Sequence, residues 1–532
     1  MRRWNGWGDE TVHYPLPDSA GAYLRTILGE ASPPHDVILA EVMAQVPPSR
    51  LPSHHLLSIE PRDRVYHARG QSLPDWIALR SGQIGAFPDA VAYPESVDQV
   101  RELLRMAARL GAALVPFGGG TSVVGHINIL PGARPVVTVD MSHMGRLLDL
   151  DAESNLATFE AGVLGPNLEA QLSAKGFTLG HSPQSFELST LGGWIVTRSN
   201  GQQSLGYGRI EALFAGGQLE TPTETLTLPV FPASAAGPDL RELVLGSEGR
   251  LGILTEATIR IRRLPESEQF VGLFFPDFAR GRAAVREMMQ ARLPLSMLRL
   301  STPLETEVTL ALAGHDRLMN LIKQWLRLRR VGDQRSMLIM GITGKEQAVQ
   351  RAREDAVALA SEHDGALVGQ GFGKLWAKGR FRTPYLRNTL WEMGYALDTL
   401  ESATEWSNIQ HLVDAIEGTL AHGLQDLGEQ VLAFSHLSHT YPWGSNVYTT
   451  FLYRIPANGD CAETLKRWQV LKSRASEAIL DAGGTISHQH GVGTDHLPYL
   501  EREKGRLGYQ AIRRMCECFD PTGMMNPGKL VV

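Results

Sequence analysis

Three consecutive glycines, Gly118-Gly119-Gly120, directly follow a short apolar run at 113–116 that predicts a β-strand. Glycine has no Cβ and adopts positive φ readily, so the backbone here can approach a ligand closely. The N–H groups of such a turn, together with the hydroxyls of Thr121 and Ser122, suit an anion such as a pyrophosphate. The spacing is not that of a Rossmann fingerprint, and the loop has no Walker lysine. Taken alone, the loop fits a plain tight turn as well as a phosphate site.

Two more loops rich in glycine and hydroxyl side chains follow along the chain. One spans 183–201 and contains Ser-Thr-Leu-Gly-Gly. The other spans 246–257, contains Gly-Ser-Glu-Gly-Arg-Leu-Gly and enters a half-buried strand. Each of them alone is compatible with an ordinary loop or hairpin turn, but in this order the three loops predict a site that wraps a flat, polar cofactor. The predicted cofactor-binding residues are Pro116, Phe117, Gly118, Gly119, Gly120, Thr121, Ser122, Gln184, Ser185, Phe186, Glu187, Leu188, Ser189, Thr190, Gly193, Thr197, Arg198, Ser199, Asn200, Glu248, Gly249, Arg250, Leu251, Gly252, Ile253 and Leu254.

Secondary-structure patterns divide the chain into four parts. Residues 1–87 are polar, rich in proline and irregular, apart from one helix-like run at 34–46. Residues 88–265 begin with strand, helix and strand and predict one compact, two-lobed unit of mixed α and β structure. Residues 266–483 alternate strands with long helices, which predicts an α+β cap domain. Residues 484–532 return to a Gly-rich loop and a helix, which we expect to complete the cofactor domain.

The composition narrows the class of protein. A formal net charge of -6 gives no sign of a nucleic-acid partner. The sequence has no run of eighteen apolar residues, no secretory signal and no peroxisomal C-terminal address, so we expect a cytoplasmic protein or one bound peripherally to a membrane. Three cysteines, Cys461, Cys516 and Cys518, are too few for a disulfide framework and fit a reducing compartment. They lack the spacing of a zinc site, so no metal is predicted.

The three loops resemble the FAD-binding domain of the vanillyl-alcohol-oxidase-like flavoproteins, whose fold is of the p-cresol methylhydroxylase (PCMH) type. The resemblance implies an α+β protein in which FAD lies between two small lobes beneath a cap domain. Many members attach FAD to a histidine in an Arg-Ser-Gly-Gly-His loop. The corresponding loop here reads Gly-Gly-Gly-Thr, so we expect non-covalent FAD. His126 lies just beyond this loop and is expected to be structural.

Further motifs resemble those of the alkylglycerone-phosphate synthase family. Trp4-Asn5-Gly6-Trp7-Gly8 is similar to a motif just ahead of that family's FAD domain. Residues 180–183, Gly-His-Ser-Pro, are similar to its cofactor loop. Tyr448 falls where the family has a catalytic tyrosine. The segment 487–493 resembles its Ser-His-His-His-Gly-Val-Gly motif, except that the middle histidine is Gln489, which cannot carry charge.

The resemblance assigns roles to individual side chains. Tyr448, His488, His490 and Arg299 are the catalytic candidates, and Arg387 is the candidate anchor for a substrate phosphate, which a guanidinium can bind through two parallel hydrogen bonds. A tyrosine has an ordinary pKa near ~10 and acts as a base only where cations favour the phenolate. His488 and His490 are candidates for supplying that charge or for relaying protons. Without the resemblance, such a histidine pair is more often structural or metal-binding.

The implied reaction uses FAD without net redox change. A proton is removed next to the ketone of an acyl-dihydroxyacetone phosphate, the substrate carbon bonds to flavin N5, a carboxylate leaves and a fatty alcohol replaces it. Two other functions stay open. One is a redox FAD enzyme, a 2-hydroxy-acid or alcohol dehydrogenase or oxidase, although the stretch from His436 to Tyr448 lacks the Gly-Asp-Gly-Asn of metal-dependent dehydrogenases. The other is a lipid- or flavin-binding protein without activity, for which Gln489 is the hint. A lipid-like or small-molecule substrate is expected, and a peripheral membrane contact and a homodimer stay open.

Overall fold

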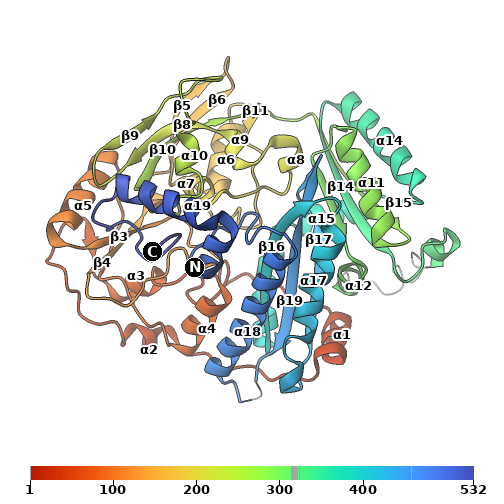
Figure 1. Cartoon of the computed structure of the whole chain (residues 1–532), viewed down its shortest axis with the longest axis horizontal. Helices are drawn as coiled ribbons and strands as arrows, with labels where there is room; N and C mark the ends of the chain where they lie inside the picture. The colour runs from red at the N-terminus through yellow and green to blue at the C-terminus, as the bar shows by residue number, and fades with distance from the viewer. Residues whose placement is uncertain (1, 313–321, 323, 457) are drawn as a thin grey trace.

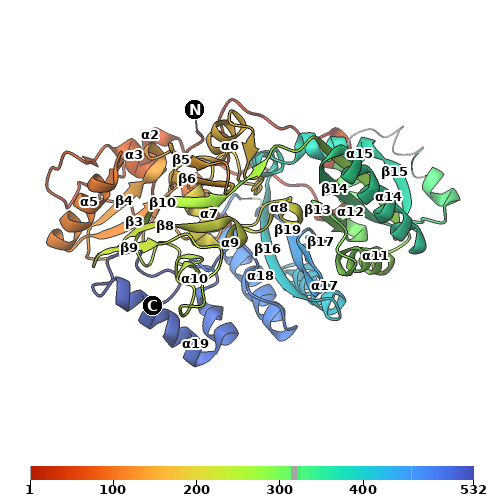
Figure 2. The same cartoon turned by 90° about the horizontal axis from the view of Figure 1, so that it is seen from above.

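Three large β-sheets organise the part of the chain that the computed structural model describes, residues 2–312, 322, 324–456 and 458–532. Two of the sheets form neighbouring lobes, and the third forms the core of the cap (Figure 1). Seen from above, the lobes and the cap stand side by side, with the C-terminal helix against the lobes (Figure 2). The mixed helix and sheet content agrees with the predicted α+β class.

The first lobe carries the glycine loop at the end of its edge strand. Its sheet has the order β1-β2-β4-β3, and β2, β4 and β3 are parallel. Helix α5 connects β2 to β3; it begins after Ser96, whose side chain accepts a hydrogen bond from Gln99 N–H, and it ends at Gly111 in the left-handed region. The strand–helix–strand pattern predicted here is confirmed. The elements are β1 (Leu57–Ser58), β2 (Ala90–Ala92), α5 (Val97–Leu110), β3 (Ala113–Phe117) and β4 (Val136–Asp140).

The second lobe is an antiparallel sheet of order β5-β6-β10-β8-β9. Helices α6 and α7 cover it through a core that includes Leu168, Trp194 and Ile195. Strand β10 has the alternating burial that its sequence predicts. The elements are β5 (Leu147–Asp151), β6 (Leu156–Glu160), α6 (Gly165–Ser173), β7 (Phe177–Thr178), α7 (Leu191–Thr197), α8 (Ser204–Tyr207), α9 (Ile210–Leu213), β8 (Phe214–Glu220), β9 (Thr225–Leu228), α10 (Arg241–Val244), β10 (Ile253–Arg260) and β11 (Arg262–Arg263).

The cap is built on an eight-stranded sheet of order β15-β12-β14-β13-β17-β19-β16, with β18 paired to β19. Helices α11, α14, α17 and α18 pack on one face in the largest apolar core. Helices α1, α12 and α15 lie on the other face. The elements are β12 (Ser267–Phe275), α11 (Phe278–Gln290), β13 (Met297–Ser301), α12 (Pro303–Leu312), β14 (Ser336–Gly344), α14 (Glu346–Glu362), β15 (Ala366–Gly369), α15 (Gln370–Gly379), α16 (Leu386–Glu392), β16 (Tyr395–Glu405), α17 (Ile409–His422), β17 (Val431–Leu437), β18 (Thr440–Tyr441), β19 (Gly444–Arg454) and α18 (Cys461–Asp481).

The N-terminal segment is more regular than its sequence predicted. It contains α1 (Asp18–Leu28), α2 (Leu39–Met43), α3 (Pro61–Tyr66) and α4 (Leu73–Ser81), so the prediction of a single helix there was wrong. Helix α1 has no side-chain cap at its start and is held by apolar contacts with the cap. Helix α4 begins with a capping box between Ser72 and Asp75, a signal that the sequence did contain. No helix in the described residues combines the length and the apolar character needed to cross a membrane.

The C-terminal chain returns to the first lobe. After α19 (Leu497–Phe519) it runs parallel to β3, where Leu114 N–H donates to Met524 O (2.9 Å) and Asn526 N–H donates to Leu114 O (2.8 Å). Asp520 holds the turn that starts this return, because its carboxylate accepts from the N–H groups of Met524 (3.1 Å) and Met525 (2.7 Å). The segment therefore extends the sheet that carries the glycine loop.

We expect Asp520→Ala to lower the free energy of unfolding by about 1–3 kcal/mol, because two buried N–H groups would lose their acceptor. Urea denaturation of the FAD-loaded protein measures this. Asp426→Ala, at an exposed position, is the control and should change stability by less than about 0.5 kcal/mol. Equal stability of the two variants would show that Asp520 does not hold the turn.

Candidate active site

A cavity of about 970 Å³ lies where the two lobes, the cap and the C-terminal segment meet. Most of the residues predicted from the sequence line it, although they come from positions as far apart as Pro116 and His490. These are Pro116, Phe117, Gly118, Gly119, Gly120, Thr121, Ser122, Gln184, Ser185, Ser189, Thr190, Gly193, Thr197, Ser199, Glu248, Gly249, Gly252, Ile253, Leu254, Arg299, Arg387, Tyr448 and His490.

The other predicted residues do not line this cavity: Phe186, Glu187, Leu188, Arg198, Asn200, Arg250, Leu251 and His488. Neighbours along a turn or helix point in different directions, and the sequence does not show which of them face a ligand. Leu251 is buried in the core of the second lobe. The guanidinium of Arg250 donates to Met525 O (2.5 Å), and that of Arg198 pairs with Glu242. His488 lines a second cleft, which shares Thr197, Glu248 and Gln489 with the central cavity.

The glycine loop packs directly against the second loop. A Cβ on Gly119 would overlap the carbonyl of Leu188, and a Cβ on Gly118 would overlap the hydroxyl of Thr190. Gly120 has φ +65°, in the left-handed region that glycine accepts. Backbone therefore lies against backbone at the cavity wall, as a loop that cradles a phosphate requires.

The third loop is tied to the C-terminal segment through Glu248. Its carboxylate accepts from the N–H groups of Val492 (2.5 Å) and Gly493 (2.8 Å). The backbone carbonyl of Glu248 accepts from Asn526 Nδ2 (2.7 Å). His126 shares a hydrogen bond with Ser122 Oγ (2.9 Å) and lies 3.2 Å from the Glu248 carboxylate. This network fixes the loop that carries His490 relative to the glycine loop.

Several buried polar atoms at the cavity wall have no hydrogen-bond partner among the described residues. They are Trp7 Nε1, His126 Nε2, Gln202 Oε1, Glu305 Oε2, Arg387 Nη2, His490 Nδ1 and Asn526 Oδ1. Each unpaired buried polar group lowers the stability of the fold by about 1–3 kcal/mol. Several such groups at one cavity wall therefore indicate a ligand that pairs with them. Together with the glycine loops, they fit a flat ligand with a polar ring edge and a pyrophosphate, as FAD has.

Tyr448, on β19, belongs to the wall of the cavity that the cap forms. Its ring stacks on His436, with centroids 4.8 Å apart, and meets the edge of His490 at 5.8 Å. Burial raises the pKa of Tyr448 to about 12, although Arg299 acts in the opposite sense. Burial also lowers the pKa of His490. Burial therefore opposes a positive charge on His490, and the side chain of His488 contacts Glu401, Tyr441 and Arg209. The role of the two histidines as a source of charge or as a proton relay stays a prediction.

Arg299 belongs to a trio with the buried residues Glu305 and His436, which the sequence did not reveal. Its guanidinium donates to Glu305 Oε1 (2.7 Å) and to His436 Nε2 (3.0 Å), and His436 Nδ1 donates to Glu305 Oε1 (2.8 Å). Burial opposes the charge on Glu305, but His436 and Arg299 outweigh it and lower the pKa of Glu305 to about 2. Arg299 and His436 are thus oriented beside Tyr448 by one carboxylate.

Arg387 is positioned by the N-terminal motif. Its guanidinium lies 4.4 Å from the centre of the Trp76 ring, and Nη1 donates to Gln71 O (2.7 Å). The next residue, Asn388, accepts from Trp7 N–H (3.1 Å) and donates to Trp7 O (3.0 Å). Gly8, at φ +79°, lies so close to the Tyr385 ring that a Cβ would overlap it. The Trp-Asn-Gly-Trp-Gly motif therefore holds the helix that presents Arg387 to the cavity.

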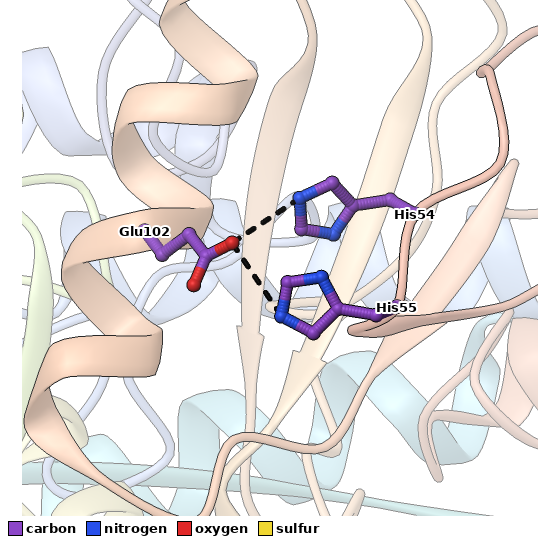
Figure 3. A group of neighbouring side chains, drawn as sticks. All are labelled: His54, His55 and Glu102. Atoms are coloured by element: carbon purple, nitrogen blue, oxygen red, sulfur yellow. Dashed lines mark ion pairs between the residues drawn. The ribbon is translucent and has the colours of Figure 1, made fainter.

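Among the described residues, one group of side chains has the composition of a metal site: His54, His55 and Glu102, in the first lobe (Figure 3). The two Nε2 atoms lie 3.4 and 3.5 Å from Glu102 Oε1. However, His54 Nδ1 accepts from Leu56 N–H (3.3 Å), so the ring carries its proton on Nε2, the atom that would have to bind a metal. The side chain of His55 is 67% exposed. The arrangement fits two imidazoles facing one carboxylate better than a metal centre.

Comparison with known proteins agrees with this geometry. Residues 88–227 match the family model "FAD binding domain", and residues 264–530 match "FAD linked oxidases, C-terminal domain". The structure of a p-cresol methylhydroxylase superposes with a TM-score of 0.66 at 14% identity over 96% of each chain, which shows a shared fold. The chain is therefore an FAD-dependent enzyme with a PCMH-type fold.

Closer relatives define the family. An alkyldihydroxyacetonephosphate synthase from Dictyostelium discoideum is 32% identical over 99% of this chain and 93% of its own length. A crystal structure of an alkyldihydroxyacetonephosphate synthase superposes with a TM-score of 0.84 at 28% identity, covering 99% of both chains. The chain belongs to the alkyldihydroxyacetonephosphate synthase family, which is also called the alkylglycerone-phosphate synthase family.

We expect Gly119→Ala to weaken FAD retention at least about tenfold, because the added methyl group collides with the rigid backbone carbonyl of Leu188. Gly132→Ala is the matched control, since a Cβ there meets no atom within 4 Å. Flavin absorbance per protein after gel filtration measures the occupancy. Equal occupancy in the two variants would contradict the packing argument.

Proposed function

We propose that this enzyme exchanges the acyl group of an acyl-dihydroxyacetone phosphate for a fatty alcohol and so forms an ether-lipid precursor. The observation that carries the proposal is the shape of the cavity. A polar end with an unpaired guanidinium and an apolar branch meet beside Tyr448 and His490, as a phosphate ester with a long chain requires.

The polar end is formed around Arg387. Its buried Nη2 has no hydrogen-bond partner among the described residues, so one pair of its donors is free for a phosphate oxygen. Arg380 and Arg382 also line the cavity nearby. A guanidinium held flat against Trp76 binds such an oxygen with little loss of side-chain entropy.

The apolar branch runs beneath α1 and α12 along the inner face of the cap sheet. It is lined by large aliphatic and aromatic side chains from elements of the N-terminal segment and the cap: Leu16, Leu24, Val308, Leu390, Leu432, Phe434 and Leu452. Each methylene group buried there contributes about 0.8 kcal/mol, so a chain of many carbons is held strongly. A small 2-hydroxy acid would leave this branch empty.

Bound FAD would supply an electron-accepting ring against which the substrate carbon reacts. The glycine loop, the second loop and Glu248–Leu254 would hold it. The protein itself would exclude water, position the phosphate through Arg387 and place Tyr448 and His490 beside the reacting carbon. We also propose that FAD is bound non-covalently, since the loop ends in Thr121 where many members of the superfamily have the attachment histidine, and His126 contacts Ser122 and Glu248.

The direct test is an exchange assay with purified FAD-loaded protein, acyl-dihydroxyacetone phosphate and a radiolabelled fatty alcohol, in the absence of oxygen. We expect label in an ether product and an oxidised flavin spectrum throughout. All flavin should leave the protein on acid precipitation. Bleaching of the flavin by a 2-hydroxy acid or alcohol, without ether formation, would show that the enzyme catalyses a redox reaction instead.

Arg387→Met should weaken binding of the phosphate substrate by about tenfold to a hundredfold, because a charge-assisted hydrogen bond contributes about 1.5–3 kcal/mol. FAD content should stay unchanged. Arg351→Met, on the exposed face of α14, is the control. An unaltered KM in Arg387→Met would show that the phosphate binds elsewhere.

A further inference from the structure

The carboxylate of Glu401 accepts several hydrogen bonds in the cap, and neither the sequence motifs nor the reaction assigned this residue a role. It lies on β16 directly opposite Tyr448 of β19 and is fully buried. Its Oε1 accepts from His488 Nδ1 (2.8 Å) and Asn446 Nδ2 (2.8 Å), and its Oε2 accepts from Gln489 Nε2 (2.6 Å). Its backbone carbonyl accepts from His488 N–H (2.9 Å). One residue thus holds the segment 487–493, the histidine loop, through His488 and Gln489.

The two histidines of this loop face different spaces. His490 lines the central cavity, and its Nε2 lies 3.7 Å from Glu401 Oε2. His490 Nδ1 is buried and has no hydrogen-bond partner among the described residues. Because Nε2 faces a carboxylate, the ring proton is favoured on Nε2, which leaves Nδ1 as a free acceptor at the cavity wall.

His488 faces a second cleft of about 1020 Å³ behind the loop. There, His488 Nε2 and the hydroxyl of Tyr441 share a hydrogen bond of 2.7 Å. Arg209 donates to the Tyr441 hydroxyl (2.8 Å) and to His488 Nε2 (3.1 Å). Tyr441 lines the cleft and is partly exposed, next to Trp443, which is 73% exposed. The chain of groups from His490 therefore ends at the solvent of a different cleft.

The proposed exchange releases one proton. The bond between the carbon and the acyl oxygen breaks, the bond to the alcohol oxygen forms, a carboxylate leaves, and the hydroxyl proton of the alcohol has no place in the ether. A fatty carboxylate is ionised at neutral pH, so this proton must leave a cavity that lipid chains fill. A path through the wall avoids the route that the substrates occupy.

We infer that Glu401, His488 and Tyr441 form a proton path that connects His490 in the central cavity with the second cleft. This inference rests on the proposed function. The proton arrives at His490 Nδ1 while the Nε2 proton passes to Glu401. His488 donates from Nδ1 at rest, so its proton first moves to Nε2. Glu401 then protonates His488 Nδ1, His488 Nε2 gives its proton to the Tyr441 oxygen, and the hydroxyl proton of Tyr441 passes to water. A neutral histidine carries its proton on either nitrogen, so the hydrogen bonds along this path can point in either direction. Arg209 stabilises the negative charge that develops on Tyr441 during transfer.

The charged and titratable groups around His490 decide its pH behaviour. They come from β16, α18 and β19 as well as from its own loop and the start of α19, and they are Glu401, Asp398, Lys472, Tyr448, His488 and His496. Burial is the main cause of the lowered pKa of His490, and Glu401 acts against it. Replacing Glu401 by glutamine should therefore lower the pKa of His490 further.

The kinetic test uses Tyr441→Phe, which removes the last hydroxyl of the path without touching the central cavity. In dilute buffer, we expect the FAD-loaded variant to turn over about tenfold more slowly than the unmodified enzyme, within the usual range for loss of a proton donor or acceptor. A small diffusible base such as imidazole should restore the rate of this variant and leave the unmodified enzyme unaffected. Tyr509→Phe, on α19 outside the path, is the control. A normal rate, or a slow rate that imidazole does not restore, would overturn the path.

A second measurement needs no substrate. Nitrogen NMR of histidine-labelled holoenzyme, with the signal of His490 identified in His490→Asn, gives its tautomer and its pKa. We expect a proton on Nε2, and a pKa that falls in Glu401→Gln and stays unchanged in Glu417→Gln, a second partly buried carboxyl of the cap. An unchanged pKa in Glu401→Gln would refute the link through Glu401. If the link is present but the exchange assay fails, the proposed function falls and the coupling of the two histidines stands.

Discussion

The two lobes meet where the glycine loop of one lies against the backbone of residues 188–190 of the other. Side chains normally separate packed segments by several ångströms, but Gly118 and Gly119 leave no room for a Cβ here. The second loop is rigid in turn, because Thr190 caps α7 and Ser189 Oγ accepts from Trp194 Nε1 (2.7 Å). The distance between the lobes, and so the width of the cofactor site, depends on this contact.

The site is held together by buried carboxylates rather than by apolar contacts. Glu248 links the third loop to the C-terminal segment, Glu305 orients Arg299, and Glu401 holds the histidine loop. Burying a charge is unfavourable unless it is paired and hydrogen-bonded, and each of these carboxylates accepts from at least two donors, although both donors to Glu305 share its Oε1. Such networks fix the side chains around a reaction more tightly than packing alone, because each partner has a defined direction. This arrangement explains why Gln489 is accepted in the middle of the histidine motif: its amide donates to Glu401 and needs no charge.

Local patterns determined most of the first lobe. The Ser96 cap, the amphipathic run after it and the glycine triplet predicted α5, β3 and the loop at almost their observed bounds. Short helices in the N-terminal segment were missed where tertiary packing supplies the stability, as for α1. The cofactor loops were found, but not the direction of each side chain within them, since Arg198 and Leu251 point away from the ligand space.

The sequence by itself determined the cofactor class and the family, because glycine positions and short motifs carry steric and chemical requirements that act within a few residues. The tertiary structure decided how the chemistry is arranged. The pKa of Tyr448 is raised because the fold buries it, and Glu401 faces it only because β16 and β19 pair in one register. His488 and His490 are two residues apart in the chain yet open to different spaces. Pairing, burial and direction depend on residues distant in sequence, and so no local pattern encodes them.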